Sequence, residues 1–184
     1  MKTRTLTAIA AVLLSITLIG SATAADPVPP AVESKPLVVF LVRHAEKVDA
    51  GRDPELSAAG HERAAALAGA LRSAEIRYVH SSDFIRTRDT AAPVAAELGL
   101  EVALYDPRDL PALVEELRRV GGRHLVVGHS NTTPSMVELL GGDPGSAIDE
   151  AGEYDRLYVV TIDRDSTASS VMMRYGDADA PLED

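Results

Sequence analysis

Hydrophobic residues along this chain gather in short runs that are separated by polar or alanine-rich segments. The run at 37–42, Leu-Val-Val-Phe-Leu-Val, contains no polar position and is followed at once by Arg43 and His44. A run of this length without polar alternation is too short to span a membrane and is typical of a strand buried on both faces of a parallel sheet. Further apolar runs predict strands at 76–80, 100–104, 124–127, 157–162 and 169–175.

The segments between these runs have the composition of helices. Helices are predicted at 57–72, 84–98, 110–120 and 133–140. Ser57 and Asp83 stand where helix N-caps are expected, and Gly99 stands where a glycine would end the second helix. Strands that alternate with helices at short spacing predict an α/β fold, here a three-layer α/β/α sandwich with a mostly parallel central sheet.

Three of the predicted strands are followed by the same kind of polar sequence. Arg43-His44 follows the first strand, Ser81-Ser82 follows the second and leads to Arg86, and Gly128-His129-Ser130 follows the fourth. The carboxyl ends of parallel strands meet at one edge of a sheet, which is where ligands bind in open α/β folds. We therefore expect these three segments to converge on a single site.

The first 24 residues have the pattern of a secretory signal peptide. A basic start precedes an apolar stretch at 6–20 and the small-x-small sequence Ala22-Thr23-Ala24. An uncleaved N-terminal anchor is the alternative. Residues 25–36 are predicted to be a flexible leader, 37–176 one domain, and 177–184 a polar tail. We therefore expect an exported protein, periplasmic or extracellular, without stable membrane insertion after cleavage of the signal.

The composition narrows the ligands that such a site could bind. The chain of 184 residues has a formal net charge of −10 and only 4% aromatic residues, which disfavours nucleic acids and anionic membranes as partners. The absence of cysteine excludes disulfides, thiolate nucleophiles and cysteine-based metal sites. A phosphate ligand would need a local cluster of basic side chains. The oligomeric state is left open.

The residues at the three strand ends can supply that cluster. Arginine binds phosphate oxygens in pairs, and a neutral imidazole can attack phosphorus and carry the phosphoryl group. Two arginines and a protonated second histidine could stabilise the transferred group without a metal or other cofactor. A carboxylic acid would then protonate the leaving oxygen. The expected contacts to a small phosphorylated substrate come from Arg43, Arg86, His129, Ser82 and Ser130.

Four segments, taken in chain order, resemble the motifs of one known family. They are Arg43-His44-Ala45-Glu46, residues 56–60 (LSAAG), residues 81–91 (SSDFIRTRDTA) and residues 127–131 (VGHSN). Together they resemble the histidine phosphatase (phosphoglycerate mutase-like) superfamily over most of residues 37–175. The resemblance implies that His44 is the phosphorylated nucleophile, that Arg43, Arg86 and His129 form the phosphate pocket, and that no metal is needed. Ala45 departs from the glycine that many members have there.

The acid that protonates the leaving group is left open by the resemblance. Larger members carry an acidic residue in an insertion between the second arginine and the second histidine, and that region is short here. Asp106 is the preferred candidate, and Asp109 and Glu46 are the alternatives. The short insertion resembles compact members rather than the glycolytic mutases and indicates an open site. Export argues against cytosolic sugar-acid and phosphorelay substrates, so the natural substrate also remains open.

The leading hypothesis is metal-independent hydrolysis of a phosphomonoester through a phosphohistidine at His44. Three other kinds of site are possible alternatives. An exported anion- or phosphate-binding module would use the same cations without turnover. A serine esterase would use Ser130, but Thr132 replaces the last glycine of the G-x-S-x-G pattern and no histidine follows His129. A zinc site of His44, His124 and His129 is disfavoured, because His124 begins the strand that His129 follows.

Overall fold

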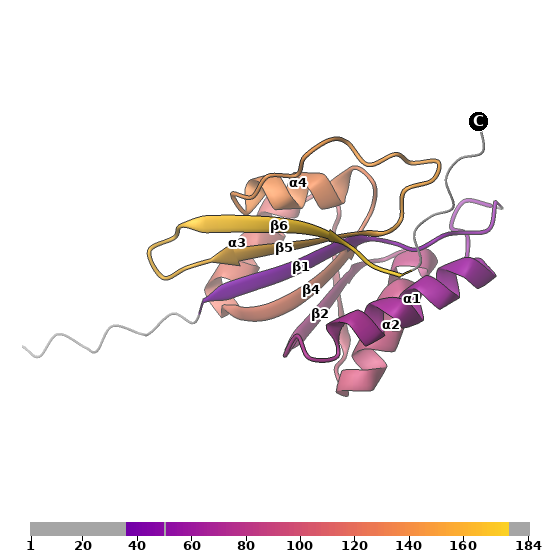
Figure 1. Cartoon of the computed structure of the whole chain (residues 1–184), viewed down its shortest axis with the longest axis horizontal. Coiled ribbons are helices and arrows are strands. Elements are labelled where there is room, and N and C mark those ends of the chain that lie inside the picture. The colour runs from indigo at the N-terminus through magenta and orange to yellow at the C-terminus, as the bar shows by residue number, and fades with distance from the viewer. Residues whose placement is uncertain (1–35, 50, 177–184) are drawn as a thin grey trace, which may run out of the picture. The chain divides into compact units, whose positions relative to one another are not determined.

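The computed structural model describes residues 36–49 and 51–176. In chain order the elements are β1 (Leu37–Arg43), α1 (Ala58–Leu71), β2 (Tyr78–Ser82), α2 (Ile85–Leu98), β3 (Val102–Tyr105), α3 (Leu110–Val120), β4 (Gly122–Gly128), α4 (Thr132–Leu139), β5 (Arg156–Ile162) and β6 (Ala168–Arg174) (Figure 1). The predicted signal peptide, nearly all of the leader and the polar tail lie outside the described residues. Within the described ranges, no helix combines the length and the apolar character needed to cross a membrane.

The six strands form one sheet in the order β3-β2-β4-β1-β5-β6. The pairs β2–β3, β2–β4 and β1–β4 are parallel, whereas β5 runs antiparallel to β1 and β6 runs antiparallel to β5. The sheet is therefore mostly parallel, as the alternation of strands and helices predicted. The strand β1, which the hydrophobic pattern singled out, lies in the interior of the sheet with all seven residues buried.

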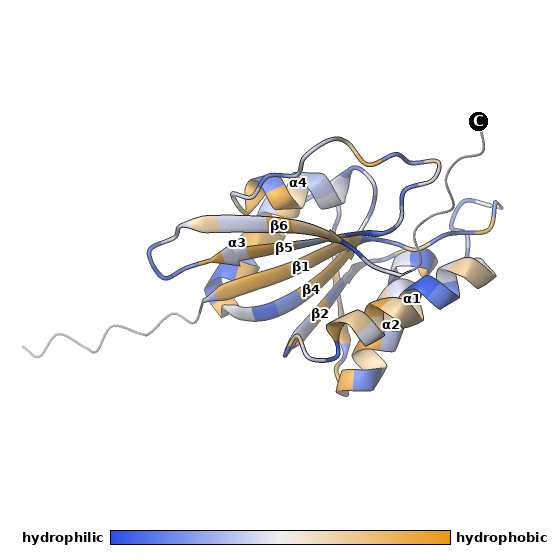
Figure 2. Cartoon of the chain, in the orientation of Figure 1, coloured by the Kyte–Doolittle hydropathy of each residue, from blue (hydrophilic) through white to orange (hydrophobic). Residues whose placement is uncertain are grey.

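Helices cover both faces of the sheet, which confirms the three-layer sandwich. One buried cluster joins α1 and α2 to the sheet through Val38, Phe40 and Val42, and the other joins α3 and α4 through Leu37, Val39 and Leu41. Successive side chains of β1 thus enter opposite layers, so the strand can have no polar alternation. Figure 2 shows the apolar strands lying between the two pairs of helices. Full burial of a residue such as Leu41 contributes roughly 1.5–3 kcal/mol.

The helix ends decide how the loops meet the sheet. The hydroxyl of Ser57 accepts a hydrogen bond from the amide of Gly60 at 3.1 Å, which confirms the predicted cap of α1. Gly99 ends α2 with a φ of +65°, a conformation that favours glycine. The predicted cap at Asp83 is wrong, because its carboxylate pairs with Arg88 instead. The amide of Ile85 at the start of α2 donates to Asp53 at 3.0 Å, from a loop far away in the sequence.

The strand β2 also differs from its prediction. It begins at Tyr78 and continues through Ser81 and Ser82, two residues that were expected to follow the strand. Both serines pair in register with neighbouring strands, and both are fully buried. Their hydroxyls are satisfied locally, since Ser81 donates to the Ser82 carbonyl at 2.8 Å and Ser82 donates to Thr87 at 3.1 Å. The parallel neighbours on both sides therefore extend the strand beyond its apolar residues.

Candidate active site

The carboxyl ends of β2, β4 and β1 lie side by side in the sheet, as the parallel order requires. Arg43 is in register with Gly128, and the amide of His44 donates to the Gly128 carbonyl at 2.9 Å. A cavity of about 510 Å³ opens beside these ends. Residues from all three strand ends and from two loops line it, among them His44, Arg86, His129, Ser130, Lys47 and Glu150. The structure thus brings together three residues that the sequence placed at separate strand ends.

The imidazole of His44 has a defined tautomer. Its Nδ1 lies 2.8 Å from the carbonyl oxygen of Ala45, which can only accept, so Nδ1 carries the proton. The other nitrogen, Nε2, is left with a free lone pair. Burial lowers the pKa of His44 to about 3, the charges of Arg43 and Arg86 act in the same direction, and the bond to Ala45 offsets this only in part. His44 is therefore a neutral imidazole at physiological pH, which is the nucleophilic form.

The second histidine, His129, is oriented by its two ring nitrogens. Nδ1 lies 3.5 Å from Nη2 of Arg86, which can only donate, so Nε2 carries the proton and donates to Oγ of Ser82 at 2.9 Å. The rings of His129 and His44 meet edge to face, with their centroids 5.6 Å apart. Burial, followed by the charges of Arg86 and Arg43, lowers the pKa of His129 to about 4.

The prediction of a protonated second histidine concerns the cavity with a phosphoryl group bound. The free cavity instead holds a neutral His129 whose charged form is opposed by two neighbouring guanidinium groups. A phosphate group in the cavity would offset those positive charges and favour the protonated form. In the free cavity the positive charge therefore comes from Arg86, Arg108 and Lys47 rather than from His129.

Arg86 lies in the first turn of α2, where the helix dipole adds to its charge. Its Nη1 lies 3.4 Å from a carboxylate oxygen of Asp53, and its guanidinium lies 4.5 Å from the ring centre of Phe84. Its buried Nε has no hydrogen-bond partner among the described residues. Asp53 thus binds both the amide of Ile85 and the side chain of Arg86. Asp53 was not among the predicted site residues, because the polar loop that contains it has no local pattern that would single it out.

Arg43 was expected to bind the phosphate in the cavity, but its side chain binds a neighbouring loop instead. Only 1% of its surface is exposed, and it is not among the described residues that line the cavity. Its guanidinium donates to the carbonyl oxygens of Asp149 at 3.0 Å, Glu150 at 2.8 Å and Glu153 at 3.0 Å, and it stacks 4.0 Å from the ring centre of Tyr154. Its charge still lowers the pKa of both His44 and His129. Arg43 therefore connects the nucleophile to the loop before β5.

The two predicted serine contacts have different surroundings. Ser82 is buried beneath the cavity and holds His129, whereas Ser130 lines the cavity itself. The amide of His129 donates to Oγ1 of Thr132 at 2.9 Å, which fixes the turn into α4. A Cβ added at Gly128 would lie 2.9 Å from that same hydroxyl, so this turn has no room for a larger residue.

None of the three predicted acids lines the cavity. Asp106 is bound through both carboxylate oxygens to the exposed Arg108, and these bonds lower the pKa of Asp106 to about 2. Asp109 caps α3 by accepting from the amide of Ala112 at 3.2 Å. Glu46 forms an ion pair with Arg63 at 2.7 Å. Among the described residues, Glu150 is the acid that lines the cavity. Glu150 was not predicted, because it lies in an irregular loop about twenty residues after His129.

The remaining histidine of the zinc hypothesis lies elsewhere. Nδ1 of His124 accepts from Nε2 of His80 at 3.0 Å, since Nε2 of His124 donates to the Gly121 carbonyl at 3.1 Å. His124 is buried near the start of β4, and His129 follows the end of that strand. Over residues 36–49 and 51–176, no group of three or more His, Asp and Glu side chains has the arrangement of a metal site.

Comparisons with known proteins find relatives in both sequence and fold. The family described as the histidine phosphatase superfamily (branch 1) matches residues 39–108. A probable phosphoglycerate mutase GpmB from Photorhabdus laumondii is 30% identical over 130 residues, which cover 67% of this chain and 59% of that protein. The GpmB of Yersinia enterocolitica, also described as a probable phosphoglycerate mutase, is 42% identical over 79 residues, which cover 39% of this chain and 36% of that protein. The chain thus spans less than two thirds of these relatives.

Among solved structures, the protein histidine phosphatase SixA complexed with tungstate has the same fold. The two structures align with a TM-score of 0.61 and 22% sequence identity, over 75% of this chain and 97% of that one. The family match starts within β1, includes the Arg43-His44 and Arg86 segments, and is accompanied by a shared architecture. The chain belongs to the histidine phosphatase superfamily.

Proposed function

We propose that this protein hydrolyses a small phosphomonoester through a phosphohistidine intermediate on His44. The observation that carries the proposal is the tautomer of His44, whose bond from Nδ1 to Ala45 leaves Nε2 unprotonated at a cavity shared with Arg86 and His129. An imidazole in this state can attack phosphorus without first losing a proton. The protein histidine phosphatase SixA, which has the same fold and was solved with bound tungstate, supports the same chemistry.

The residues around His44 suit the charge that develops during transfer. The transferred group spreads negative charge over three equatorial oxygens, so that positioned cations and amide groups supply most of the stabilisation. Arg86 and the amino-terminal residues of α4 line the cavity, and Arg43 adds positive charge from behind the nucleophile. As the Nε2–P bond forms, His44 becomes positively charged, and the Ala45 carbonyl then accepts a stronger hydrogen bond from Nδ1.

Turnover of p-nitrophenyl phosphate in excess chelator tests this function. Wild-type protein and His61→Ala should release phosphate at equal rates, because His61 is an exposed residue of α1. His44→Ala should lose activity by about 10⁴-fold or more, since the covalent route is removed. Activity that disappears with the chelator or survives His44→Ala would contradict the proposal. Phosphate binding by a wild-type protein that shows no turnover would favour a binding module instead.

A further inference from the structure

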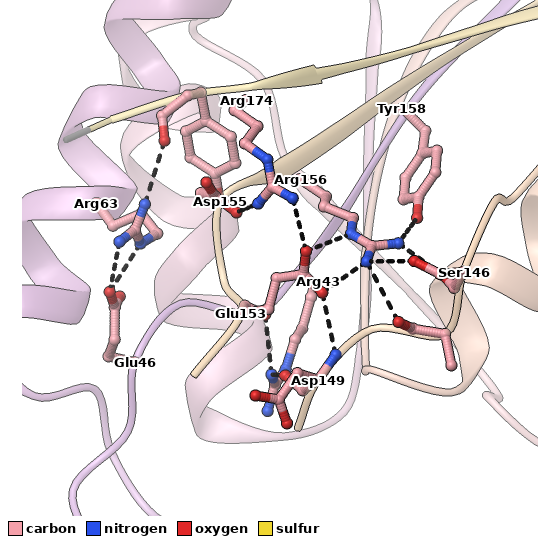
Figure 3. Close-up of polar contacts among 12 residues, drawn as sticks. Arg43, Glu46, Arg63, Ser146, Asp149, Glu153, Asp155, Arg156, Tyr158 and Arg174 are labelled. Atoms are coloured by element: carbon pink, nitrogen blue, oxygen red, sulfur yellow. Dashed lines mark hydrogen bonds and ion pairs between the residues drawn. The ribbon is translucent and has the colours of Figure 1, made fainter. Parts of the chain in front are cut away.

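The loop 143–155, between α4 and β5, is irregular but is held by a dense polar network. Arg156 at the start of β5 is only 6% exposed, and it donates to the Ser146 carbonyl at 2.7 Å, the Ala147 carbonyl at 3.2 Å and both oxygens of Glu153 at 2.7 Å. Glu153 also accepts from Arg174 at 2.8 Å and from the amide of Asp149 at 3.0 Å (Figure 3). This loop therefore has a fixed conformation despite its lack of helix or strand.

The charge state of Glu153 shows how strongly the network is bound. Burial would raise the pKa of Glu153, but the bonds from Arg156, the Asp149 amide and Arg174 outweigh it and lower that pKa to about 2. Arg174 also pairs with Asp155, so β6 is tied to the same loop (Figure 3). The network thus remains ionised over the range in which the proposed chemistry would run.

Arg43 connects this loop to the nucleophile. Its guanidinium binds the carbonyl oxygens of Asp149 and Glu153 (Figure 3). It also binds that of Glu150 at 2.8 Å, and the backbone of Arg43 continues directly into His44. The buried side chain of Arg43 therefore fixes the backbone position of Glu150 relative to His44. The contact from Arg43 thus ties the backbone of this loop to the strand that carries the nucleophile.

The carboxylates of this loop divide into two groups. All but one bind amides or arginines, namely those of Asp143, Asp149, Glu153 and Asp155. The carboxylate of Glu150 makes no hydrogen bond or ion pair with any described residue and instead lines the cavity with His44, Arg86 and His129. Among the described residues that line this cavity, Glu150 is the one acid. The loop therefore places an exposed acidic residue beside the cavity in which a leaving oxygen and a water molecule would lie.

A purely electrostatic role for Glu150 fits these observations less well. Lys47 and Arg108 also line the cavity, yet neither comes within ion-pair distance of Glu150 among the described contacts. The charge of Glu150 favours the charged form of the Arg43 guanidinium, but a carboxylate without an ion pair opposes the binding of a phosphate in the same cavity. A carboxyl group at this position can instead contribute to the reaction by giving a proton to the leaving oxygen and taking one from water.

We propose that Glu150 is the general acid and base of the site, an assignment that rests on the function proposed above. In the first step, the lone pair of His44 Nε2 forms a bond to phosphorus, the bond to the ester oxygen breaks, and the Glu150 carboxyl gives its proton to that oxygen. In the second step, the Glu150 carboxylate takes a proton from water, the water oxygen attacks phosphorus, and the P–N electron pair returns to His44. Glu150 is then protonated again, and an alcohol and inorganic phosphate have formed from ester and water.

The dependence of Glu150→Gln on the leaving group tests this assignment. p-Nitrophenolate leaves without a proton, whereas an alkoxide needs one. Glu150→Gln should therefore keep its kcat/KM for p-nitrophenyl phosphate within about tenfold of wild type and lose about 10²–10⁴-fold for glycerol 2-phosphate. Glu115→Gln, an exposed residue of α3, removes the same charge elsewhere and should change neither value. Formate should restore part of the glycerol 2-phosphate activity of Glu150→Ala, because a small acid can occupy the space of the missing carboxyl.

Four results would overturn the assignment. An equal loss for both substrates would mean that Glu150 acts in binding or folding, and no loss for either would mean that it takes no part. A leaving-group-dependent loss in Asp106→Asn or Asp109→Asn, with Glu150→Gln unaffected, would assign the proton to the residues that the sequence favoured. Absence of p-nitrophenyl phosphate turnover in wild-type protein would overturn the proposed function itself, and the Glu150 assignment with it.

Discussion

The residues next to His44 in the chain determine its chemistry. The Ala45 carbonyl fixes the tautomer of the imidazole, and the Ala45 amide donates to Oγ1 of Thr90 at 2.9 Å. Thr90 in turn donates to the Arg86 carbonyl at 2.7 Å, so one hydroxyl joins the nucleophile segment to the helix that carries Arg86. The Ala45 methyl packs against Leu56 and Ala64, so this position has room for the side chain of alanine.

Thr90→Val tests this connection at the level of a single hydroxyl. The side chain keeps its shape, but the Ala45 amide loses its acceptor in a fully buried position. We expect the free energy of unfolding, measured in urea, to fall by about 1–3 kcal/mol, and kcat to fall with it. Thr161→Val, on β5, should change the unfolding free energy by less than about 0.5 kcal/mol. Equal effects of the two substitutions would show that the Thr90 hydroxyl is not a structural link.

The sequence predicted some residues of the candidate site and not others. His44, Arg86 and His129 were predictable, because each follows a buried strand and parallel strands place such positions together. Asp53 and Glu150 were not, because their positions depend on loops whose course is set by tertiary contacts with Arg86, Arg43 and Arg156. Asp106 was favoured for its place in the chain, and its exposed pairing with Arg108 is a local contact that the sequence did not indicate.

Among the elements, α1 and the segment after β1 are in close backbone contact at Gly60. A Cβ at Gly60 would lie 2.1 Å from the carbonyl oxygen of Glu46, and that oxygen also accepts from the amide of Ser57 at 2.9 Å. The glycine of the LSAAG motif therefore allows the first turn of α1 to rest on the backbone two residues after His44. The pattern of the sequence predicted the helix and its cap, but this contact between backbones requires the folded structure.

Two glycines of α1 give a matched comparison. Gly60→Ala forces apart two backbone segments, so we expect a loss of about 1–3 kcal/mol in the free energy of unfolding and a lower kcat. Gly69 has no atom within 4 Å of an added Cβ, so Gly69→Ala should stabilise the protein by about 0.5–1 kcal/mol. Urea denaturation measures both. If Gly60→Ala were tolerated as well as Gly69→Ala, the close approach would have no energetic role.

At the scale of the whole molecule, histidine burial couples stability to pH. Burial lowers the pKa of His44 to about 3 and those of His80 and His129 to about 4, and it also lowers the pKa of His124. In the unfolded chain these groups have a pKa near 6.5. Between about pH 6.5 and 4 the unfolded chain therefore binds protons that the folded protein does not.

The folded protein should accordingly lose stability as the pH falls from 7 to 5. Because more than one histidine contributes, we expect the free energy of unfolding to fall by more than about 1.4 kcal/mol per pH unit. His80→Gln can still donate to His124 but does not titrate, so its pH dependence should be smaller by about one proton. Urea unfolding at a series of pH values measures both slopes. A stability that is constant over this range, or an unchanged slope in His80→Gln, would contradict the buried neutral histidines.

The central claim is that Nε2 of His44 carries the phosphoryl group, and direct isolation of the phosphoenzyme tests it. Wild-type protein mixed with a ³²P-labelled aryl phosphate in excess chelator is quenched in base within milliseconds, digested and analysed by mass spectrometry. The account predicts one acid-labile, base-stable phosphoryl group on the peptide that contains His44, and none in His44→Ala. A label on any other residue, or steady turnover without a labelled protein, would contradict it.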